Sequence, residues 1–250
     1  MKVSLITVCY QAEQTIAACI DSVLSQDYPD IEYIIIDGNS SDRTAEIVRS
    51  YGERISVFVS EKDAGIYDAM NKGILRATGE LVGILNADDL YAYPGVISDV
   101  VRTIREQQAD AVYGDLVYVD EKDTTCVKRY WKSGAYKDGS FRWGWMPPHP
   151  TFFVKRACYE QYGLFNTSFR ISADYEMMLR LIHKNRIRVA YLPKVLIRMR
   201  LGGVSNASVQ NRVLGNREDR RAWELNGLKP WFFTLYMKPL RKIRQFIFRS

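Results

Sequence analysis

Short apolar runs recur along the first hundred residues, and the segments between them space their apolar side chains differently. Each run is rich in β-branched residues and precedes a polar or glycine-containing turn: residues 4–8, 33–37, 56–59 and 81–85. Such runs predict buried parallel strands. In the intervening segments the apolar residues recur every three or four positions, which predicts helices at residues 15–25, 42–51 and 67–77.

These elements follow one another as strand, helix, strand, helix from residue 4 to about residue 100. Asp42, followed by Glu46, resembles the start of a capped helix and supports the second helical segment. Alternation of this kind predicts an α/β fold with a doubly wound, mostly parallel sheet flanked by helices. Ligands bind such sheets at the carboxyl ends of the strands, so the polar residues that follow each strand are the candidates for a binding site.

The second part of the chain has a different pattern. Residues 111–113 and 116–119 are strand-like, and an aromatic, glycine-rich stretch follows at residues 131–145. Binding surfaces are often built from such loops, because loops tolerate variation that a packed sheet does not. We therefore expect this part to shape a binding surface beside the predicted sheet.

Composition limits the cellular setting. The cysteines, Cys9, Cys19, Cys126 and Cys158, are scattered without a CxxC pair, which argues against a zinc site or a secreted disulfide scaffold. The apolar run at the N-terminus is too short for a signal peptide. No segment has the roughly 18–20 uninterrupted apolar residues that cross a bilayer. We expect a cytoplasmic protein that is not integral to the membrane.

The formal net charge of +6 is concentrated in the C-terminal segment. From Lys229 onward the chain has basic residues, no acidic residue, and bulky apolar residues such as Trp231 and Phe246. This composition predicts an interfacial helix on an anionic membrane surface, in two pieces because Pro230 and Pro239 interrupt it. The alternative is a C-terminal helix that packs on the domain with its basic side chains in solvent.

Two adjacent carboxylates, Asp88 and Asp89, follow the apolar run at residues 81–85. Adjacent carboxylates repel each other unless a cation or hydrogen-bond donors hold them. Mg²⁺ and Mn²⁺ prefer carboxylate oxygens and are often completed by substrate phosphates and water, so the pair predicts a site for a metal and a diphosphate. The alternative is a helix N-cap, since Leu90 could begin a helix.

Three further polar residues accompany the first two strands. Asp37 ends the second apolar run in a loop of small residues, where its carboxylate could accept from a base N–H or a ribose hydroxyl. Thr7 and Tyr10 occupy the corresponding region of the first strand, and the ring of Tyr10 could stack on a base. Taken singly, each is more often a turn or capping residue; their shared location favours nucleotide binding.

Together these residues resemble the family 2 glycosyltransferases, whose nucleotide-binding half has the GT-A fold, over most of the first 205 residues. Residues 4–44 are similar to the first nucleotide-binding segment of that family, in which Thr7, Tyr10 and Asp37 would occupy base-binding positions. The residues NADD at 86–89 resemble the family's DxD-type metal motif, with asparagine in place of the first aspartate. Gln11 stands where asparagine often follows the tyrosine.

The resemblance implies a role for individual side chains. Asp88 would contact ribose or phosphate, and Asp89 would hold Mg²⁺ or Mn²⁺. Asp68 would face the nucleotide; the alternative is an acid in the first turn of a helix. His149 would lie near the acceptor and the metal; the alternative is a structural histidine bonded to a loop. The basic loop at residues 198–205 resembles a mobile segment that closes over the diphosphate.

Residues 171–181 resemble the region that carries the family's general base, which makes Asp174 the expected base. In an inverting transfer the acceptor hydroxyl loses a proton as it attacks the anomeric carbon from the face opposite the diphosphate. One carboxylate within hydrogen-bond reach can take that proton. Glu176 competes for the role, but two positions apart on a helix the two side chains point to different faces. The alternative for Asp174 is an N-terminal helix acid after Ser172.

The sequence therefore predicts an inverting glycosyltransferase that moves a sugar from a nucleoside-diphosphate-sugar donor to a hydroxyl of a lipid-linked or polysaccharide acceptor. The resemblance implies bacterial surface-glycan assembly at the inner face of the membrane. We expect a GT-A catalytic domain at residues 1–205, with a nucleotide-binding half at 1–100 and an acceptor half at 101–205. A basic, aromatic helical extension would follow at residues 206–250.

Two other functions are less consistent with the sequence. A sugar-phosphate nucleotidyltransferase would favour a glycine-rich loop after the first strand to cradle a triphosphate, and this chain has none there. A non-catalytic basic module that binds membrane or nucleic acid would explain the C-terminal segment but not the carboxylates at the strand ends. Those carboxylates would repel nucleic-acid phosphates, so we expect no nucleic-acid partner.

Overall fold

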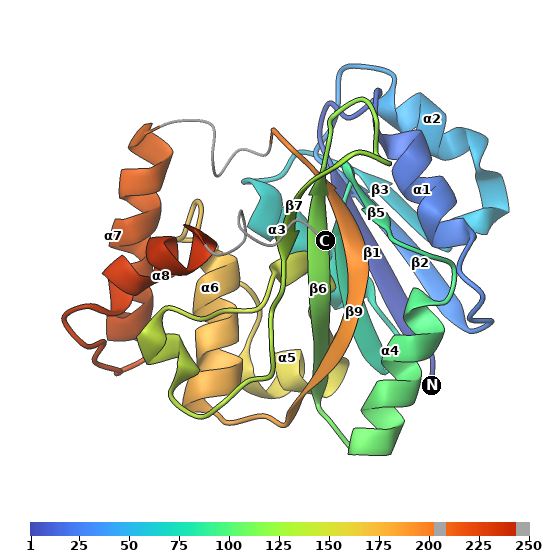
Figure 1. Ribbon diagram of the computed structural model, residues 1–250. Coiled ribbons are helices and arrows are strands. Elements are labelled where there is room, and N and C mark those ends of the chain that lie inside the picture. Colours follow the sequence, from blue (N-terminus) through green and yellow to red (C-terminus); the bar gives the residue numbers. More distant parts are fainter. Residues whose placement is uncertain (203–208, 244–250) are drawn as a thin grey trace.

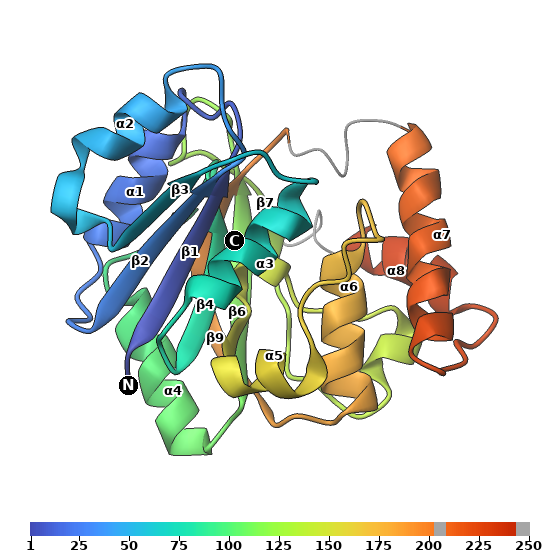
Figure 2. The same cartoon turned by 180° about the vertical axis from the view of Figure 1, so that it is seen from behind.

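The computed structural model describes residues 1–202 and 209–243, which form a nine-stranded sheet with helices on both faces (Figures 1 and 2). The strand order is β3-β2-β1-β4-β8-β6-β9-β5, and β7 pairs with β6. The elements of the first half are β1 (Val3–Cys9), α1 (Ile16–Leu24), β2 (Ile31–Asp37), α2 (Thr44–Ser50), η1 (Gly52–Arg54), β3 (Val57–Ser60), α3 (Ile66–Arg76), β4 (Leu81–Asn86), β5 (Asp89–Tyr91) and α4 (Val96–Gln107).

The second half contains β6 (Ala111–Val119), β7 (Val127–Trp131), η2 (Ser140–Trp143), η3 (His149–Thr151), β8 (Phe153–Lys155), α5 (Arg156–Tyr162), α6 (Ala173–Met178), η4 (Leu179–Lys184), β9 (Val189–Arg200), α7 (Val209–Leu225) and α8 (Thr234–Ile243). The predicted α/β fold is confirmed. The four strands predicted in the first hundred residues form the parallel set β3-β2-β1-β4.

The sheet separates two hydrophobic cores because its central strands are apolar on both faces. One core lies between the sheet and the layer of α1, α2 and α4, and the other between the sheet and the layer of α3, α5, α6 and α7. Alternate residues of a strand point to opposite faces, so Leu5 and Ile6 of β1 enter different cores. Continuous apolar runs are what a doubly covered parallel sheet requires.

Helix α3 lies unusually close to β1. A Cβ atom added at Gly73 would come within 2.4 Å of a methyl group of Ile6, so only glycine permits this approach without displacing β1 or α3. Tyr67 and Asp68 stand in the first turn of α3, at the carboxyl end of β3. The packing at Gly73 therefore fixes where the start of α3 meets the edge of the sheet.

The two strand-like runs after residue 110 are parts of one strand, β6, whose pairing with β9 is irregular near Asp115. Asp115 is buried, and its carboxylate accepts hydrogen bonds from the hydroxyls of Tyr130 and Tyr191 and from the backbone N–H of Ser133. These contacts tie the aromatic stretch to the sheet. A buried carboxylate is stabilised when donors of this kind satisfy its oxygens.

The C-terminal helices pack on the domain through aromatic contacts. The ring of Trp143 lies 5.5 Å from that of Trp231 and 5.1 Å from that of Phe233. The expected break at Pro239 is wrong: α8 continues through it, at the cost of one backbone hydrogen bond. In contrast, Phe232 stays 89% exposed.

Three expectations fall on residues outside the described parts of the chain. The boundary predicted between residues 205 and 206 and the end of the basic loop lie in residues 203–208, and Phe246 lies beyond residue 243. Within the described parts of the chain, no helix is long and apolar enough to cross a membrane.

Candidate active site

Strand register brings the predicted nucleotide-binding residues to one edge of the sheet. Cys9, the last residue of β1, pairs with Asp37 of β2, and Val8 pairs with Asn86 of β4. The carboxyl ends of these three strands therefore lie side by side. We call the residues that follow or end them the donor edge: Tyr10, Asp37, Asp88 and Asp89.

Asp37 is fully buried and hydrogen-bonded within its own loop. Its carboxylate accepts from the backbone N–H of Ser40 at 3.1 Å and from the hydroxyls of Ser40 and Ser60 at 2.5 and 2.6 Å. Tyr10 is 63% exposed, and its ring lies beside Gly38, which directly follows Asp37. The donor edge thus offers an exposed aromatic face next to a carboxylate held by hydroxyl groups.

Thr7 is not part of this edge. Its side chain is fully buried, and its hydroxyl lies 3.0 Å from the hydroxyl of Tyr33 and 3.8 Å from the thiol of Cys19. These neighbours belong to the core under α1, so the side chain of Thr7 points away from the surface where Tyr10 lies. A direct contact between the Thr7 hydroxyl and a nucleotide is inconsistent with this orientation.

The adjacent carboxylates differ in exposure. Asp89 begins β5 and is fully buried, whereas Asp88 is partly exposed. Burial, and then the charge of Asp88, hold the pKa of Asp89 well above its usual range, and burial also raises the pKa of Asp88. Arg200 of β9 opposes both shifts, and its guanidinium donates to the backbone carbonyl of Asp88 at 2.8 Å.

Two oxygen atoms at this end of β4 have no hydrogen-bond partner: Oδ1 of Asn86 and Oδ1 of Asp89, both buried. The Asn86 amide donates to the other carboxylate oxygen of Asp89 at 3.3 Å, so the unpartnered oxygens belong to adjoining side chains. Within the described residues, no three His, Cys, Asp or Glu side chains form a metal-holding group. Asp89, with the neighbouring Asn86, nevertheless fits Mg²⁺ or Mn²⁺, because these ions take one or two carboxylates and complete their shell with phosphates and water.

Asp68 occupies the first turn of α3. Its carboxylate accepts from the backbone N–H of Ala64 at 3.1 Å and forms an ion pair with Lys72 at 3.4 Å. These are the contacts of a helix-capping acid. The helix-capping role considered as the alternative is thus present, and the side chain still lies beside the carboxyl end of β3.

Asp174 lies in the first turn of α6 and is partly exposed. Its Oδ1 atom is 3.3 Å from the hydroxyl of Tyr67, which also donates to the backbone carbonyl of Ile171 at 2.6 Å. Glu176 is buried and engaged by Arg180 at 3.0 Å and by the amide of Asn226 at 3.0 Å. Of the two acids, only Asp174 is available to a substrate.

His149 belongs with Asp174 rather than with the adjacent carboxylates. The imidazole is 9% exposed and meets the ring of Phe165 edge-on, with centroids 5.4 Å apart. Burial lowers the pKa of His149, although the nearby charge of Asp174 opposes this. A neutral imidazole with this packing is consistent with the structural role that the sequence left open.

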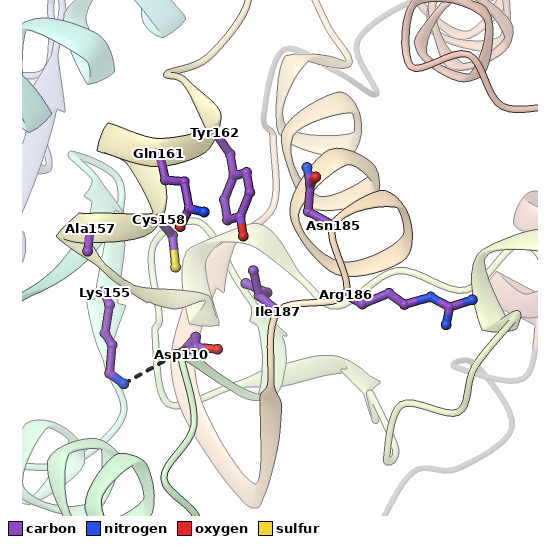
Figure 3. Close-up of a pocket in the computed structure, with 9 residues that line it drawn as sticks. All are labelled: Asp110, Lys155, Ala157, Cys158, Gln161, Tyr162, Asn185, Arg186 and Ile187. Carbon is purple, nitrogen blue, oxygen red and sulfur yellow. Dashed lines mark hydrogen bonds and ion pairs between the residues drawn. The ribbon is translucent and has the colours of Figure 1, made fainter.

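The pocket in Figure 3 lies at the opposite end of the sheet from the donor edge. It is lined by Asp110 and Ile187, which precede β6 and β9, and by residues of α5 such as Cys158 and Tyr162. Lys155 forms an ion pair with Asp110 across it. None of the predicted site residues lines this pocket, so it is separate from the candidate active site.

Tyr67 and Glu218 were missed from the sequence although both contact the surroundings of Asp174. Tyr67 reaches Asp174 across 107 positions of sequence, and Glu218 reaches Ser172 across 46. No local pattern marks such pairs. Tyr67 directly precedes Asp68 in a segment predicted to be helical. The helical spacing of apolar residues there could have placed the Tyr67 side chain on the face that packs on the core.

The sequence profile described as glycosyl transferase family 2 matches residues 4–163. The PGL/p-HBAD biosynthesis glycosyltransferase of Mycobacterium tuberculosis is 27% identical over 228 residues, which cover 84% of this chain and 82% of that protein. Glycosyltransferase GlyG of Streptococcus pneumoniae is 30% identical over 124 residues, covering 48% of this chain and 41% of that protein.

Solved structures show the same fold at low sequence identity. Residues 1–349 of S. aureus TarS match at a TM-score of 0.69 and 18% identity, covering 98% of this chain and 72% of that one. The chain spans 44% of the longer TarS structure. Mannosyltransferase PcManGT from Pyrobaculum calidifontis, in complex with GDP-Man and Mn²⁺, matches at a TM-score of 0.67 and 18% identity, covering 98% of this chain and 69% of that one.

The profile match covers the donor edge, and the fold agrees with GT-A transferases over the rest of the described chain. The protein is a glycosyltransferase that belongs to glycosyl transferase family 2.

Proposed function

We propose that the protein transfers a sugar from a nucleoside-diphosphate-sugar donor to an acceptor hydroxyl with inversion at the anomeric carbon. The observation that carries this proposal is the availability of Asp174: it is partly exposed, while its neighbour Glu176 is buried in contacts with Arg180 and Asn226. One available carboxylate suits a single displacement, in which one group removes the acceptor proton.

The donor would bind at the donor edge. The exposed ring of Tyr10 offers a stacking surface for the base, and Asp37 and Asp68 lie at the neighbouring strand ends. A TarS structure contains UDP-GlcNAc and the PcManGT structure contains GDP-Man, which supports a sugar nucleotide as the donor class. Ligands of open α/β sheets bind at this edge because the strand ends and helix starts converge there.

Asp89 would hold Mg²⁺ or Mn²⁺, with the Asn86 amide orienting it, and Asp88 would contact the ribose or a phosphate of the donor. The metal, when bound, neutralises charge that develops on the leaving diphosphate. The presence of Mn²⁺ in the PcManGT complex supports the choice of ion. The unpartnered oxygens of Asn86 and Asp89 support a metal site here, because buried oxygens without a hydrogen-bond donor favour a cation.

Asp174 would accept the proton of the attacking hydroxyl. The Tyr67 hydroxyl orients one carboxylate oxygen and leaves the other for the acceptor. Buried His149 would support the acceptor side of the site beside Asp174 rather than hold the metal.

A lipid-linked or polysaccharide acceptor at an anionic membrane surface completes the proposal. The exposed side chains of Phe232, Tyr236 and Leu240, on or just before α8, would enter the lipid interface. Lys229 and Arg241 would pair with anionic headgroups. The name of the mycobacterial relative, which places it in PGL/p-HBAD biosynthesis, is compatible with such an acceptor.

Calorimetric titration with nucleoside diphosphates, each with and without Mn²⁺, tests the donor site. We expect one base to bind with Mn²⁺ and more weakly without it. Asp88→Asn and Asp89→Asn should weaken binding, whereas Asp123→Asn, in an exposed loop, should not. Absence of metal-dependent binding for every nucleotide would contradict the proposal, and so would synthesis of a sugar nucleotide from a nucleoside triphosphate.

A further inference from the structure

The loop that precedes α6 is held by a side chain from the C-terminal helix α7. The carboxylate of Glu218 accepts three hydrogen bonds from successive backbone N–H groups, those of Arg170, Ile171 and Ser172, each at 2.8 Å. Successive N–H groups that point the same way form a concavity suited to an anion. Glu218 is 7% exposed, so these charge-assisted bonds lie largely out of water.

The same loop is held from the opposite direction by α3. The Tyr67 hydroxyl donates to the backbone carbonyl of Ile171 at 2.6 Å and lies 3.3 Å from Oδ1 of Asp174. Burial, and then the charge of Asp174, hold the pKa of Tyr67 well above its usual range, with a smaller contribution from Glu218. The phenol therefore stays protonated and donates. Ile171 is thus fixed through its N–H by α7 and through its C=O by α3.

Helix α7 also contacts α6 itself, and the two helices lie next to each other in Figures 1 and 2. The indole N–H of Trp223 donates to the hydroxyl of Tyr175 at 2.8 Å, directly after Asp174. The hydroxyl of Ser172 donates to the backbone carbonyl of Gly215 at 3.3 Å. Asp174 therefore lies between residues that α7 holds, which restricts its backbone to one orientation.

We propose that Glu218 is a positioning residue for the general base, so that α7 forms part of the catalytic unit. This rests on the proposed role of Asp174. Glu218 accepts hydrogen bonds from the backbone of residues 170–172 and acts by setting where the first turn of α6 begins. Because a small displacement of a catalytic group costs large factors in rate, loss of these bonds should reduce turnover without changing donor affinity.

The test compares Glu218→Gln with Glu224→Gln, which removes the same charge from an exposed position of the same helix. A glutamine at 218 can accept through only one oxygen, and its NH₂ group would face a backbone N–H. We expect kcat to fall about tenfold in Glu218→Gln, which corresponds to about 1.4 kcal/mol. The Kd for donor and Mn²⁺ should be unchanged, and Glu224→Gln should match the wild type in both.

A double-mutant cycle separates positioning from general destabilisation. In an Asp174→Asn background, Glu218→Gln should change the residual turnover less than about twofold, because the group it positions is no longer a base. An equal fall in both backgrounds would contradict action through Asp174. Wild-type turnover in Asp174→Asn would instead contradict the proposed function itself.

Glu218→Asp provides a second variant that keeps the charge but shortens the side chain. We expect kcat to decrease less than in Glu218→Gln, with donor Kd again unchanged. If Glu218→Gln does not fold, this variant decides the question, because it retains the carboxylate. Wild-type kcat in either folded variant, or a loss of donor binding that parallels the loss of kcat, would overturn the positioning role.

Discussion

The donor edge and the surroundings of Asp174 place carboxylates by different means. Asp37 ends β2 and Asp88 follows β4, where the register of β1 with β2 and β4 sets their position. Asp174 lies on a short helix that side chains from α3 and α7 hold. Apart from Asp89, whose strand β5 pairs with β9, the donor edge is therefore built by pairing within the first hundred residues, whereas the surroundings of Asp174 are built by contacts distant in sequence.

The two regions also differ in the environment of their carboxylates. Asp89 is buried, has an unpartnered oxygen and ionises reluctantly, so the donor edge favours a cation. Asp174 is partly exposed and oriented by a protonated phenol, so it can accept a proton from a substrate. Under the proposed function, a bound ligand would complete the donor edge, whereas protein contacts already order the surroundings of Asp174. Four substitutions probe this contrast, in decreasing order of expected effect.

Asp174→Asn should have the largest effect. Removal of the base should lower kcat by about 10³-fold, within the range for general base catalysis. Steady-state transfer assays measure kcat, and calorimetry with nucleoside diphosphate and Mn²⁺ should show an unchanged Kd. Glu176→Asn would not serve as a control because Glu176 is buried in an ion pair; Asp123→Asn, in an exposed loop, does. Equal losses of turnover and donor affinity would remove the distinction between the two regions.

Asp89→Asn should weaken metal-dependent donor binding by about 10²-fold or more. Loss of a group that merely orients a metal ligand costs about 10- to 100-fold in metal affinity, and loss of the ligand itself should cost at least as much. The same change should stabilise the metal-free protein by about 2 kcal/mol at neutral pH, because it removes a buried carboxylate whose ionisation is costly. The folded pKa of Asp89 is raised, so the wild type loses stability as pH rises from near the unfolded pKa.

Urea denaturation with a chelator, at pH 5 and pH 8, measures this gain in stability. The gain should be larger at pH 8 than at pH 5, because the raised folded pKa of Asp89 makes the wild type lose stability over this range. A stability loss in Asp89→Asn at pH 8 would show that the carboxylate is satisfied without a metal.

Tyr67→Phe should have an intermediate effect. It keeps the stacking on Phe165, whose ring lies 5.7 Å away, and removes only the hydroxyl that holds Ile171 and Asp174. We expect kcat to fall about tenfold, as for one lost hydrogen bond of about 1.4 kcal/mol. Steady-state transfer assays measure kcat, and an unchanged kcat would contradict this orienting role.

Phe232→Ser should have the smallest effect on catalysis. Phe232 is 89% exposed and comes just before α8, which lies apart from β1, β2 and β3 in Figures 1 and 2. Vesicle sedimentation with anionic lipid should show a few-fold weaker binding, since one aromatic side chain leaves the interface. Transfer to a soluble acceptor should be unchanged. Equal vesicle binding by the variant would leave α8 as a packing element only.

The sequence predicted the elements that depend on local pattern. The parallel strands, the helices α1 to α3 and the meeting of Asp37 with the Asp88–Asp89 pair at one edge all follow from periodicity and strand order. Helical spacing also separates the directions of Asp174 and Glu176, and of the two only Glu176 is buried; the catalytic role of Asp174 stays a prediction. Local sequence is sufficient where the backbone decides position.

The remaining features depend on tertiary packing. Thr7 lies in a strand that is apolar on both faces, so its sequence does not reveal that its hydroxyl turns toward Tyr33. The burial of Asp89 depends on β9, more than a hundred positions away. The continuation of α8 through Pro239 depends on its support by η2 and α7. None of these three features can be predicted from a short segment of the sequence.

The pairing of β5 with β9 limits how this enzyme can be recombined with its relatives. The match to the family profile ends at residue 163, yet β9, which pairs with Asp89 of β5, and α6, which carries Asp174, both lie after it. A chimera joined at residue 163 would combine the donor edge of one protein with the β9 strand and the Asp174 helix of another. Exchange of acceptor specificity should therefore use a junction within a loop of the second half, with β9 and α7 retained from the parent that supplies Asp89.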